Sequence, residues 1–266
     1  MVNWSLVLHF RILSLILFLL FSCEDALEFN PLDPENNPDF EAPETTITVT
    51  DLDGSTLDTS SVTIDFEGND LVVEYAYSLN GGDYSDWTNS TSVTYDYLDE
   101  GAYTFSVKGR YITGDEDETP AIANFSVDMV GDNGIRAYPL LTEIGTATDV
   151  NIHAEVVEDL VFFSFQIQYD PAVLTIDASA ITRGSLISGI TDYAFLPKSI
   201  STGLIEISYT ALGSSGVSGT GSLANITLSG NAEGSSSLQI INPQFGYIDG
   251  SVVQVANVAN GMVVVE

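Results

Sequence analysis

The chain contains few basic residues and almost no cysteine. Its 266 residues include one cysteine, two histidines and six lysines and arginines together, against 38 aspartates and glutamates. With Cys23 as the single cysteine, the chain can form neither an intrachain disulfide nor a cysteine-based metal site. The formal net charge of −32 repels nucleic acid and anionic lipid headgroups, so neither is expected as a partner.

The side chains that most enzymes use are equally scarce. His153 is the only histidine after Cys23, and its position between Asn151 and Glu155 in an alternating segment predicts that it faces solvent. A lone imidazole cannot form a typical zinc site. There is no Gly-x-Ser-x-Gly elbow, and no glycine-rich loop precedes a helix. The sequence therefore predicts a non-catalytic protein with no catalytic residues, no cofactor and no metal site.

Two acidic segments share some features with calcium loops. Residues 51–54 read Asp-Leu-Asp-Gly, and residues 114–118 combine a glycine with four acidic side chains. No downstream glutamate completes the first segment, and the spacing of the second fits no known loop motif. We expect a turn and a solvated loop at these two places.

The first 23 residues have the features of a targeting segment. The apolar run Ile12–Phe21 is too short to span a bilayer comfortably, and Ser22 and Cys23 follow it. This pattern resembles the bacterial lipoprotein signal, which implies that Cys23 carries the lipid. The acidic pair Glu24–Asp25 resembles a surface-export signal of Bacteroidetes-type lipoproteins. We expect a lipid-anchored protein outside the cytoplasm, on the outer-membrane surface; an uncleaved membrane anchor is the alternative.

The rest of the chain divides into a linker and two β-domains. Residues 24–43 are acidic and rich in proline, which predicts a stiff, extended linker. Residues 44–130 contain short alternating strands and the turn Asn80–Gly82, without helical periodicity, so we expect a β-sandwich. In the stretch Leu98–Val107, Gly101 and Tyr103 open an alternating strand. This stretch resembles the tyrosine corner of Ig-like and fibronectin type III-like sandwiches, which implies that the Tyr103 hydroxyl binds upstream backbone.

Residues 131–266 show strands at the spacing of a jelly-roll sandwich, and no segment with sustained helical periodicity. The predicted strands, in chain order, are Ile135–Leu141, Val150–Val157, Val161–Tyr169, Val173–Asp177, Tyr193–Leu196, Leu204–Leu212, Ser222–Ser229, Ser237–Ile241, Val252–Val255 and Met262–Val265. The whole chain is therefore predicted to be all-β.

Three motifs in this second domain resemble those of the cohesin family. The strand Phe165–Tyr169 runs into Asp170–Pro171 and a second apolar strand, a Gly-Ser-Leu loop follows at Gly184, and Gly219–Leu228 reads Gly-x-Gly-x-Leu-Ala-x-Ile-Thr-Leu. The resemblance implies a jelly-roll sandwich similar to carbohydrate-binding modules, and a dockerin-containing protein as the partner.

The family docks its partner on the face made by its third, fifth, sixth and eighth strands. Carried onto this chain, these are Val161–Tyr169, Tyr193–Pro197, Leu204–Leu212 and Ser222–Leu228. Side chains alternate between the two faces of a strand. Phe162, Leu196 and Leu223 are the predicted apolar anchors among the outward residues, which are Phe162, Ser164, Gln166, Gln168, Leu196, Glu206, Ser208, Thr210, Leu223, Asn225 and Thr227.

Glycan binding is the competing interpretation. The second domain has no tryptophan, whereas Tyr84 and Trp87 lie beside a turn of the first domain and could stack on sugar rings. The sequence thus leaves open a surface scaffold that captures a dockerin-bearing protein in polysaccharide degradation. It equally allows a glycan-binding lipoprotein of a polysaccharide uptake system, or a spacer without a specific ligand.

Overall fold

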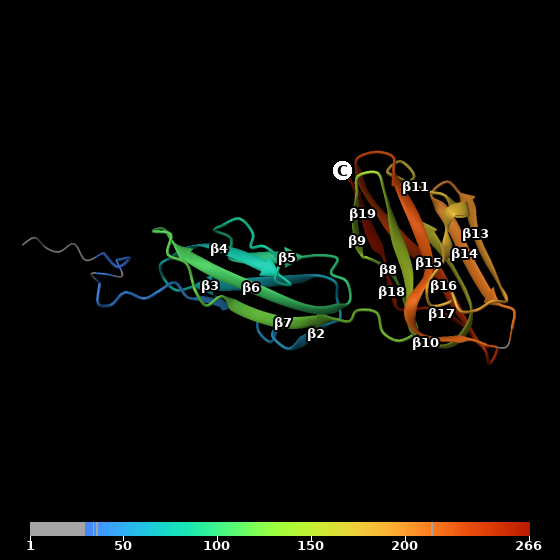
Figure 1. The fold of residues 1–266 in the computed structure, drawn as a ribbon, viewed down its shortest axis with the longest axis horizontal. Coiled ribbons are helices and arrows are strands. Elements are labelled where there is room, and N and C mark those ends of the chain that lie inside the picture. Colours follow the sequence, from blue (N-terminus) through green and yellow to red (C-terminus); the bar gives the residue numbers. More distant parts are fainter. Residues whose placement is uncertain (1–29, 34, 36, 214) are drawn as a thin grey trace, which may run out of the picture.

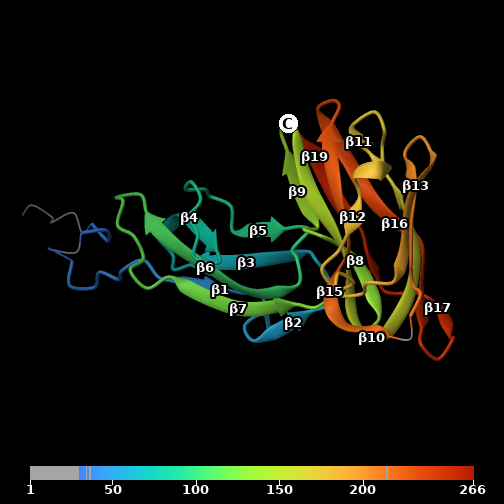
Figure 2. The same ribbon diagram turned by 45° about the vertical axis from the view of Figure 1, so that its right-hand side comes forward.

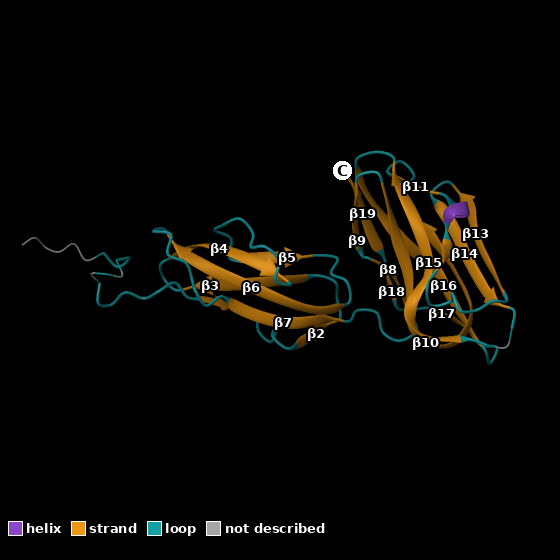
Figure 3. Ribbon diagram, viewed as in Figure 1, coloured by secondary structure: helices purple, strands orange, loops and turns teal. Residues whose placement is uncertain are grey.

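The computed structural model describes residues 30–33, 35, 37–213 and 215–266. Cys23 and the rest of the predicted targeting segment lie outside the described residues. The described part of the chain contains nineteen β-strands and one short 3-10 helix, arranged as two β-domains (Figure 1, Figure 3). In that part, no helix has the length and apolar character needed to span a bilayer. The predicted all-β class is confirmed.

Two sheets form the first domain. One has the strand order β1-β3-β5 and the other β2-β7-β6-β4, where β2 runs parallel to β7. Ile64, Phe66, Phe105 and Phe125 alternate with exposed residues along their strands and fill the space between the sheets. The strands are β1 (Thr45–Ile47), β2 (Ser55–Leu57), β3 (Val62–Gly68), β4 (Val72–Leu79), β5 (Ser92–Tyr95), β6 (Gly101–Tyr111) and β7 (Ala121–Val127).

Tyr103 forms the corner that the sequence predicts. Its hydroxyl donates to the backbone carbonyl of Asp99 at 2.8 Å. Its ring stacks on Phe125, with the centroids 5.4 Å apart. The hydrogen bond fixes the chain where it enters β6, so the structural role predicted for Tyr103 is confirmed.

The last part of the predicted linker packs on the first domain. Asn37 and Pro43 are buried, and the ring of Phe40 meets the ring of Tyr111 edge-on at 6.3 Å. The Tyr111 hydroxyl donates to the backbone carbonyl of Glu41 at 2.8 Å. These contacts show that the packed unit begins several residues before the predicted boundary at residue 44.

The second domain is a two-layer sandwich built around the bent strand β10. Its elements are β8 (Gly134–Tyr138), β9 (Leu141–Ile144), β10 (Ala147–Gln168), β11 (Leu174–Ile176), the 3-10 helix η1 (Ala178–Ala180), β12 (Thr182–Arg183), β13 (Tyr193–Ser201), β14 (Leu204–Ala211), β15 (Val217–Gly230), β16 (Gly234–Tyr247), β17 (Val252–Gln254), β18 (Val258–Ala259) and β19 (Gly261–Val265).

Strand β10 replaces two strands that the sequence predicts separately. Its first half pairs with β8 and β15, and its second half pairs with β14 and β16. Val156 and Asp159 adopt positive φ angles of 42° and 52° between the two halves, where the pairing with β15 also shifts register. This irregularity lets one strand pass from one layer to the other, as bulges do at sandwich corners.

The core of the second domain lies between these layers, where Phe163, Phe165, Ile207 and Leu223 are fully buried. The first domain meets this sandwich near β8 and β9, and β13 lies on the side away from the first domain in both views (Figure 1, Figure 2). The outer face of the β13–β14 layer is therefore not covered by the first domain.

Candidate protein-binding face

One layer of the second domain presents a continuous outward face. Its strand order is β13, β14, the second half of β10, then β16, with β17 at the edge. In this register Gln166 lies opposite Glu206 on one side and opposite Ile241 on the other. Alternate residues of β13, β14 and the second half of β10 therefore form transverse rows on the same face, and β16 joins these rows with a register shift between Ile241 and Gln244.

Eight of the residues predicted from the sequence lie on this face. Along β10, Phe163, Phe165 and Ile167 are buried, whereas the residues between them are not. Leu196 is 63% exposed. The predicted outward orientation is thus confirmed for these eight residues, while their role in binding stays a prediction: Phe162, Ser164, Gln166, Gln168, Leu196, Glu206, Ser208 and Thr210.

The other three predicted residues lie elsewhere. Leu223, Asn225 and Thr227 belong to β15, which pairs with the first half of β10 in the opposite layer. Leu223 is fully buried, so its prediction as an exposed anchor is wrong. The pairing steps from Ala224 directly to Ser222, and this bulge at Leu223 interrupts the alternation on which the prediction relied.

Asn225 and Thr227 are engaged within their own layer. The Asn225 amide nitrogen donates to the carbonyl of Arg183 at 3.2 Å. The Thr227 hydroxyl donates to Asp149 at 2.7 Å. Neither residue adjoins the face formed by β13, β14 and β16, because β15 pairs with a different half of β10.

Strand β16 is the fourth strand of the face, and the sequence prediction missed it. Gln239, Ile241 and Gln244 lie opposite Gln168, Gln166 and Ser164. The sequence contains a signal for this strand. The family docks its partner on its eighth strand, and in chain order Ser222–Ser229 is the seventh predicted strand, whereas Ser237–Ile241 is the eighth.

Polar groups without net charge dominate this face. The Gln166 amide donates to a carboxylate oxygen of Glu206 at 3.3 Å, and the hydroxyls of Ser164 and Ser208 lie 3.3 Å apart. Phe162 covers Gly246, where an added Cβ would lie 3.0 Å from the Phe162 Cβ. The face therefore combines hydrogen-bonding groups with the apolar side chains of Phe162 and Leu196, which is the composition of a protein interface.

The aromatic pair of the first domain is arranged differently. Tyr84 is 39% exposed and Trp87 is half-buried. The Arg110 guanidinium lies 4.3 Å from the Trp87 ring centroid, and the Lys108 ammonium lies 4.9 Å from that of Tyr84. Lys108 also lies 5.3 Å from the Trp87 ring centroid, so cations cover part of both rings and a sugar could stack only on the ring surface that remains exposed.

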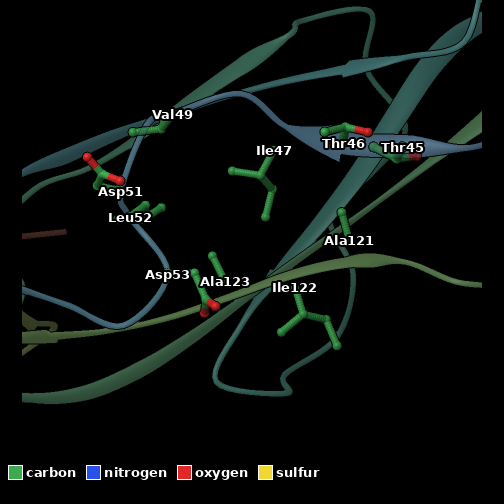
Figure 4. A pocket seen from close by; sticks show the side chains of 10 residues that line it. All are labelled: Thr45, Thr46, Ile47, Val49, Asp51, Leu52, Asp53, Ala121, Ile122 and Ala123. Carbon is green, nitrogen blue, oxygen red and sulfur yellow. The ribbon is translucent and has the colours of Figure 1, made fainter.

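A cleft of about 550 Å³ lies between the edges of β1 and β7 (Figure 4). The two aspartates of the predicted Asp-Gly turn line it, but their carboxylates point apart. Asp53 accepts the backbone N–H of Asn124 at 2.7 Å and so fixes the turn against β7. Among the described residues, no three His, Cys, Asp or Glu side chains are grouped closely enough to hold a metal ion.

His153 is half-buried, so the prediction that it faces solvent is wrong. Strand β8 pairs alongside it and brings the ring of Tyr138 within 4.9 Å of the imidazole. Its Nδ1 is buried without a hydrogen-bond partner. Burial and the nearby charge of Arg136 lower the pKa of His153 below 6.5.

Comparison with known proteins bears on the second domain. The Cohesin domain family model matches residues 142–265. No curated protein matches the sequence.

Solved structures that are similar include a non-cellulosomal cohesin from Archaeoglobus fulgidus, with 21% identity, a TM-score of 0.43, and coverage of 51% of this chain and 92% of that one. The sixth cohesin of scaffoldin B from Acetivibrio cellulolyticus, solved with a dockerin, has 18% identity, a TM-score of 0.45, and coverage of 51% and 100%. A type II cohesin dyad from the ScaA scaffoldin of the same organism has 12% identity, a TM-score of 0.44, and coverage of 84% and 98%. The family match identifies residues 142–265 of this chain as a cohesin domain.

Proposed function

We propose that the second domain captures a dockerin-bearing protein on the face formed by β13, β14, the second half of β10 and β16. The observation that carries the proposal is the composition of this face within a cohesin domain. On a chain of net charge −32, it presents amides, hydroxyls and the apolar side chains of Phe162 and Leu196. Such a face can bury apolar anchors without desolvating many carboxylates, which a protein interface requires.

We propose further that the whole protein is a non-catalytic scaffold held at the outer-membrane surface through a lipid on Cys23. The captured partner would be an enzyme of polysaccharide degradation, kept near the cell. The position of the face supports this arrangement, since β13 lies on the side away from the first domain (Figure 1). A bound partner would then extend away from the membrane.

The test is capture from the native secretome with the chain from residue 24 onward, in the presence of calcium, followed by identification of the bound proteins. We expect a protein with a dockerin module. Leu196→Asp should abolish capture, because it places a charge among the apolar contacts. Ile112→Asp is the matched control, since Ile112 is 79% exposed on the first domain. Recovery of no dockerin module, or equal recovery by both variants, would contradict the proposal.

Tyr84 and Trp87 support a second candidate, contact with a polysaccharide through the first domain. Both rings are partly accessible, and the Lys108 ammonium lies over both of them, which places them on the same surface. Binding to a plant, algal or bacterial glycan array that is lost in Trp87→Ala and kept in Leu196→Asp would favour this function. An array without any binding would remove it.

A further inference from the structure

Nearly every basic side chain in the described part of the chain forms an ion pair or hydrogen bond within the chain. Lys108 pairs with Glu116, and Arg110 pairs with Glu74 at 2.6 Å. Arg136 contacts Glu155 at 2.6 Å, and Arg183 donates to two backbone carbonyls, at 3.1 and 2.9 Å. Among the described residues, Lys198 is the one cation that makes no hydrogen bond, ion pair or ring contact within the chain.

Lys198 lies on the proposed binding face. It is exposed on β13, two residues after Leu196, so both side chains project from the same face. It stands opposite Glu206 in the register of β13 and β14. The Glu206 carboxylate instead accepts a hydrogen bond from Gln166 on the opposite side. The face therefore combines the exposed apolar side chain of Leu196 with the ammonium group of Lys198, which makes no hydrogen bond, ion pair or ring contact within the described part of the chain.

Two internal roles could account for Lys198. An exposed ion pair with Glu206 would contribute little to stability, which leaves the ammonium available to a partner. A lysine on an edge strand can also prevent edge-to-edge pairing with another sheet, and β13 pairs only with β14. The second role predicts aggregation when Lys198 is replaced, but no change in partner affinity.

We propose that Lys198 is a specificity residue that pairs with a carboxylate of the partner, while Leu196 contacts an apolar side chain one helical turn away from that carboxylate. This inference rests on the proposed function. Alternate residues of a strand are about 6.6–6.8 Å apart. Residues i and i+4 of a helix are about 6 Å apart along its axis. A partner helix lying along β13 therefore matches the two side chains with an apolar and an acidic residue at positions i and i+4.

Titration calorimetry with the dockerin module recovered in the capture experiment tests this assignment. Lys198→Glu should weaken binding about 30-fold or more, because it places two carboxylates opposite each other. Lys198→Met keeps an unbranched side chain of similar length, and should weaken binding less and reduce its dependence on NaCl concentration. Ala232→Glu changes the net charge by the same amount as Lys198→Met, at an exposed loop position, and should bind like the parent protein.

A compensating substitution makes the test specific. Changing the facing Asp or Glu of the dockerin to Lys should restore binding to Lys198→Glu and weaken binding to the parent protein. If both Lys198 variants bind like the parent while Leu196→Asp does not, the assignment of Lys198 is wrong and the proposed function stands. Aggregation of Lys198→Met with unchanged affinity would identify edge protection as its role. If the parent protein captures no dockerin, both proposals fail.

Discussion

The guanidinium Nε of Arg136, in the second domain, lies 3.2 Å from a carboxylate oxygen of Glu100, in the first domain. The same Nε donates to Glu155 at 2.6 Å, and all three side chains are largely buried. Glu100 also accepts the N–H of Val130, and the neighbouring Asp99 accepts the N–H of Leu140. Asp99 and Glu100, at the tyrosine corner of the first domain, thus contact the start of the second domain with their carboxylates. These charge-assisted contacts join the two domains.

The first prediction concerns this junction. Glu100→Gln should lower the free energy of unfolding by about 1–3 kcal/mol, because the neutral amide removes the buried charge that pairs with Arg136. Glu74→Gln is the control with the same chemical change, since Glu74 pairs with Arg110 at the surface, and it should cost at most about 1 kcal/mol. Urea denaturation measures both. Equal losses in the two variants would show that the junction adds no more stability than a surface ion pair.

The tyrosine corner gives a second matched pair. Tyr103→Phe removes the hydroxyl that binds the Asp99 carbonyl and should cost about 1 kcal/mol of stability. Tyr84→Phe removes a hydroxyl that shares a solvent-exposed hydrogen bond with Ser106, and this change should lower stability by at most about 0.5 kcal/mol. Thermal unfolding of the two variants distinguishes the roles. A Tyr103→Phe protein as stable as the parent would contradict a structural role for the corner.

Substitution of the two leucines predicted as anchors should affect stability very differently. Leu223→Ala should destabilise the protein by about 2–5 kcal/mol, because it leaves a cavity in the core. Leu196→Ala should change stability by less than about 0.5 kcal/mol, because its side chain is exposed. Chemical denaturation tests both values. In a binding assay with the captured dockerin, Leu196→Ala should weaken binding, and an unaffected affinity would remove Leu196 from the interface.

His153 should make stability depend on pH. Its pKa is lowered in the folded protein, chiefly by burial, so the unfolded chain takes up a proton more readily. The stability linked to this group is present above the unfolded value of 6.5 and is lost as the pH falls through the folded pKa. Denaturation from pH 7.5 to pH 5, in the parent and in His153→Gln, should show a smaller loss in the variant.

This measurement needs both the parent protein and His153→Gln, because other groups also make stability depend on pH. Burial raises the pKa of Asp99 and of Glu100, and the stability linked to these carboxylates is lost in the opposite direction, as the pH rises. Subtracting the two stability profiles cancels contributions that the variants share. Parallel profiles over the whole range would show that His153 is not the titrating group.

Alternation in the sequence determined which side chains of β10 and β14 point outward, because each strand has a regular two-residue period and one buried face. It also located the tyrosine corner, whose residues are contiguous in the chain. Composition determined the net charge and excluded disulfides. These features depend on near neighbours in the chain, and the sequence contains them directly.

Tertiary structure alone decided how the strands are assembled. The bend between Val156 and Asp159 sends the two halves of β10 into different layers, so β16, and not β15, completes the outward face. The bulge at Leu223 turns that side chain into the core. The burial of Glu155 and His153 depends on β8, which brings Arg136 and Tyr138 against them. Pairing partners and domain contacts arise from residues distant in the chain, and the local pattern of a strand does not specify them.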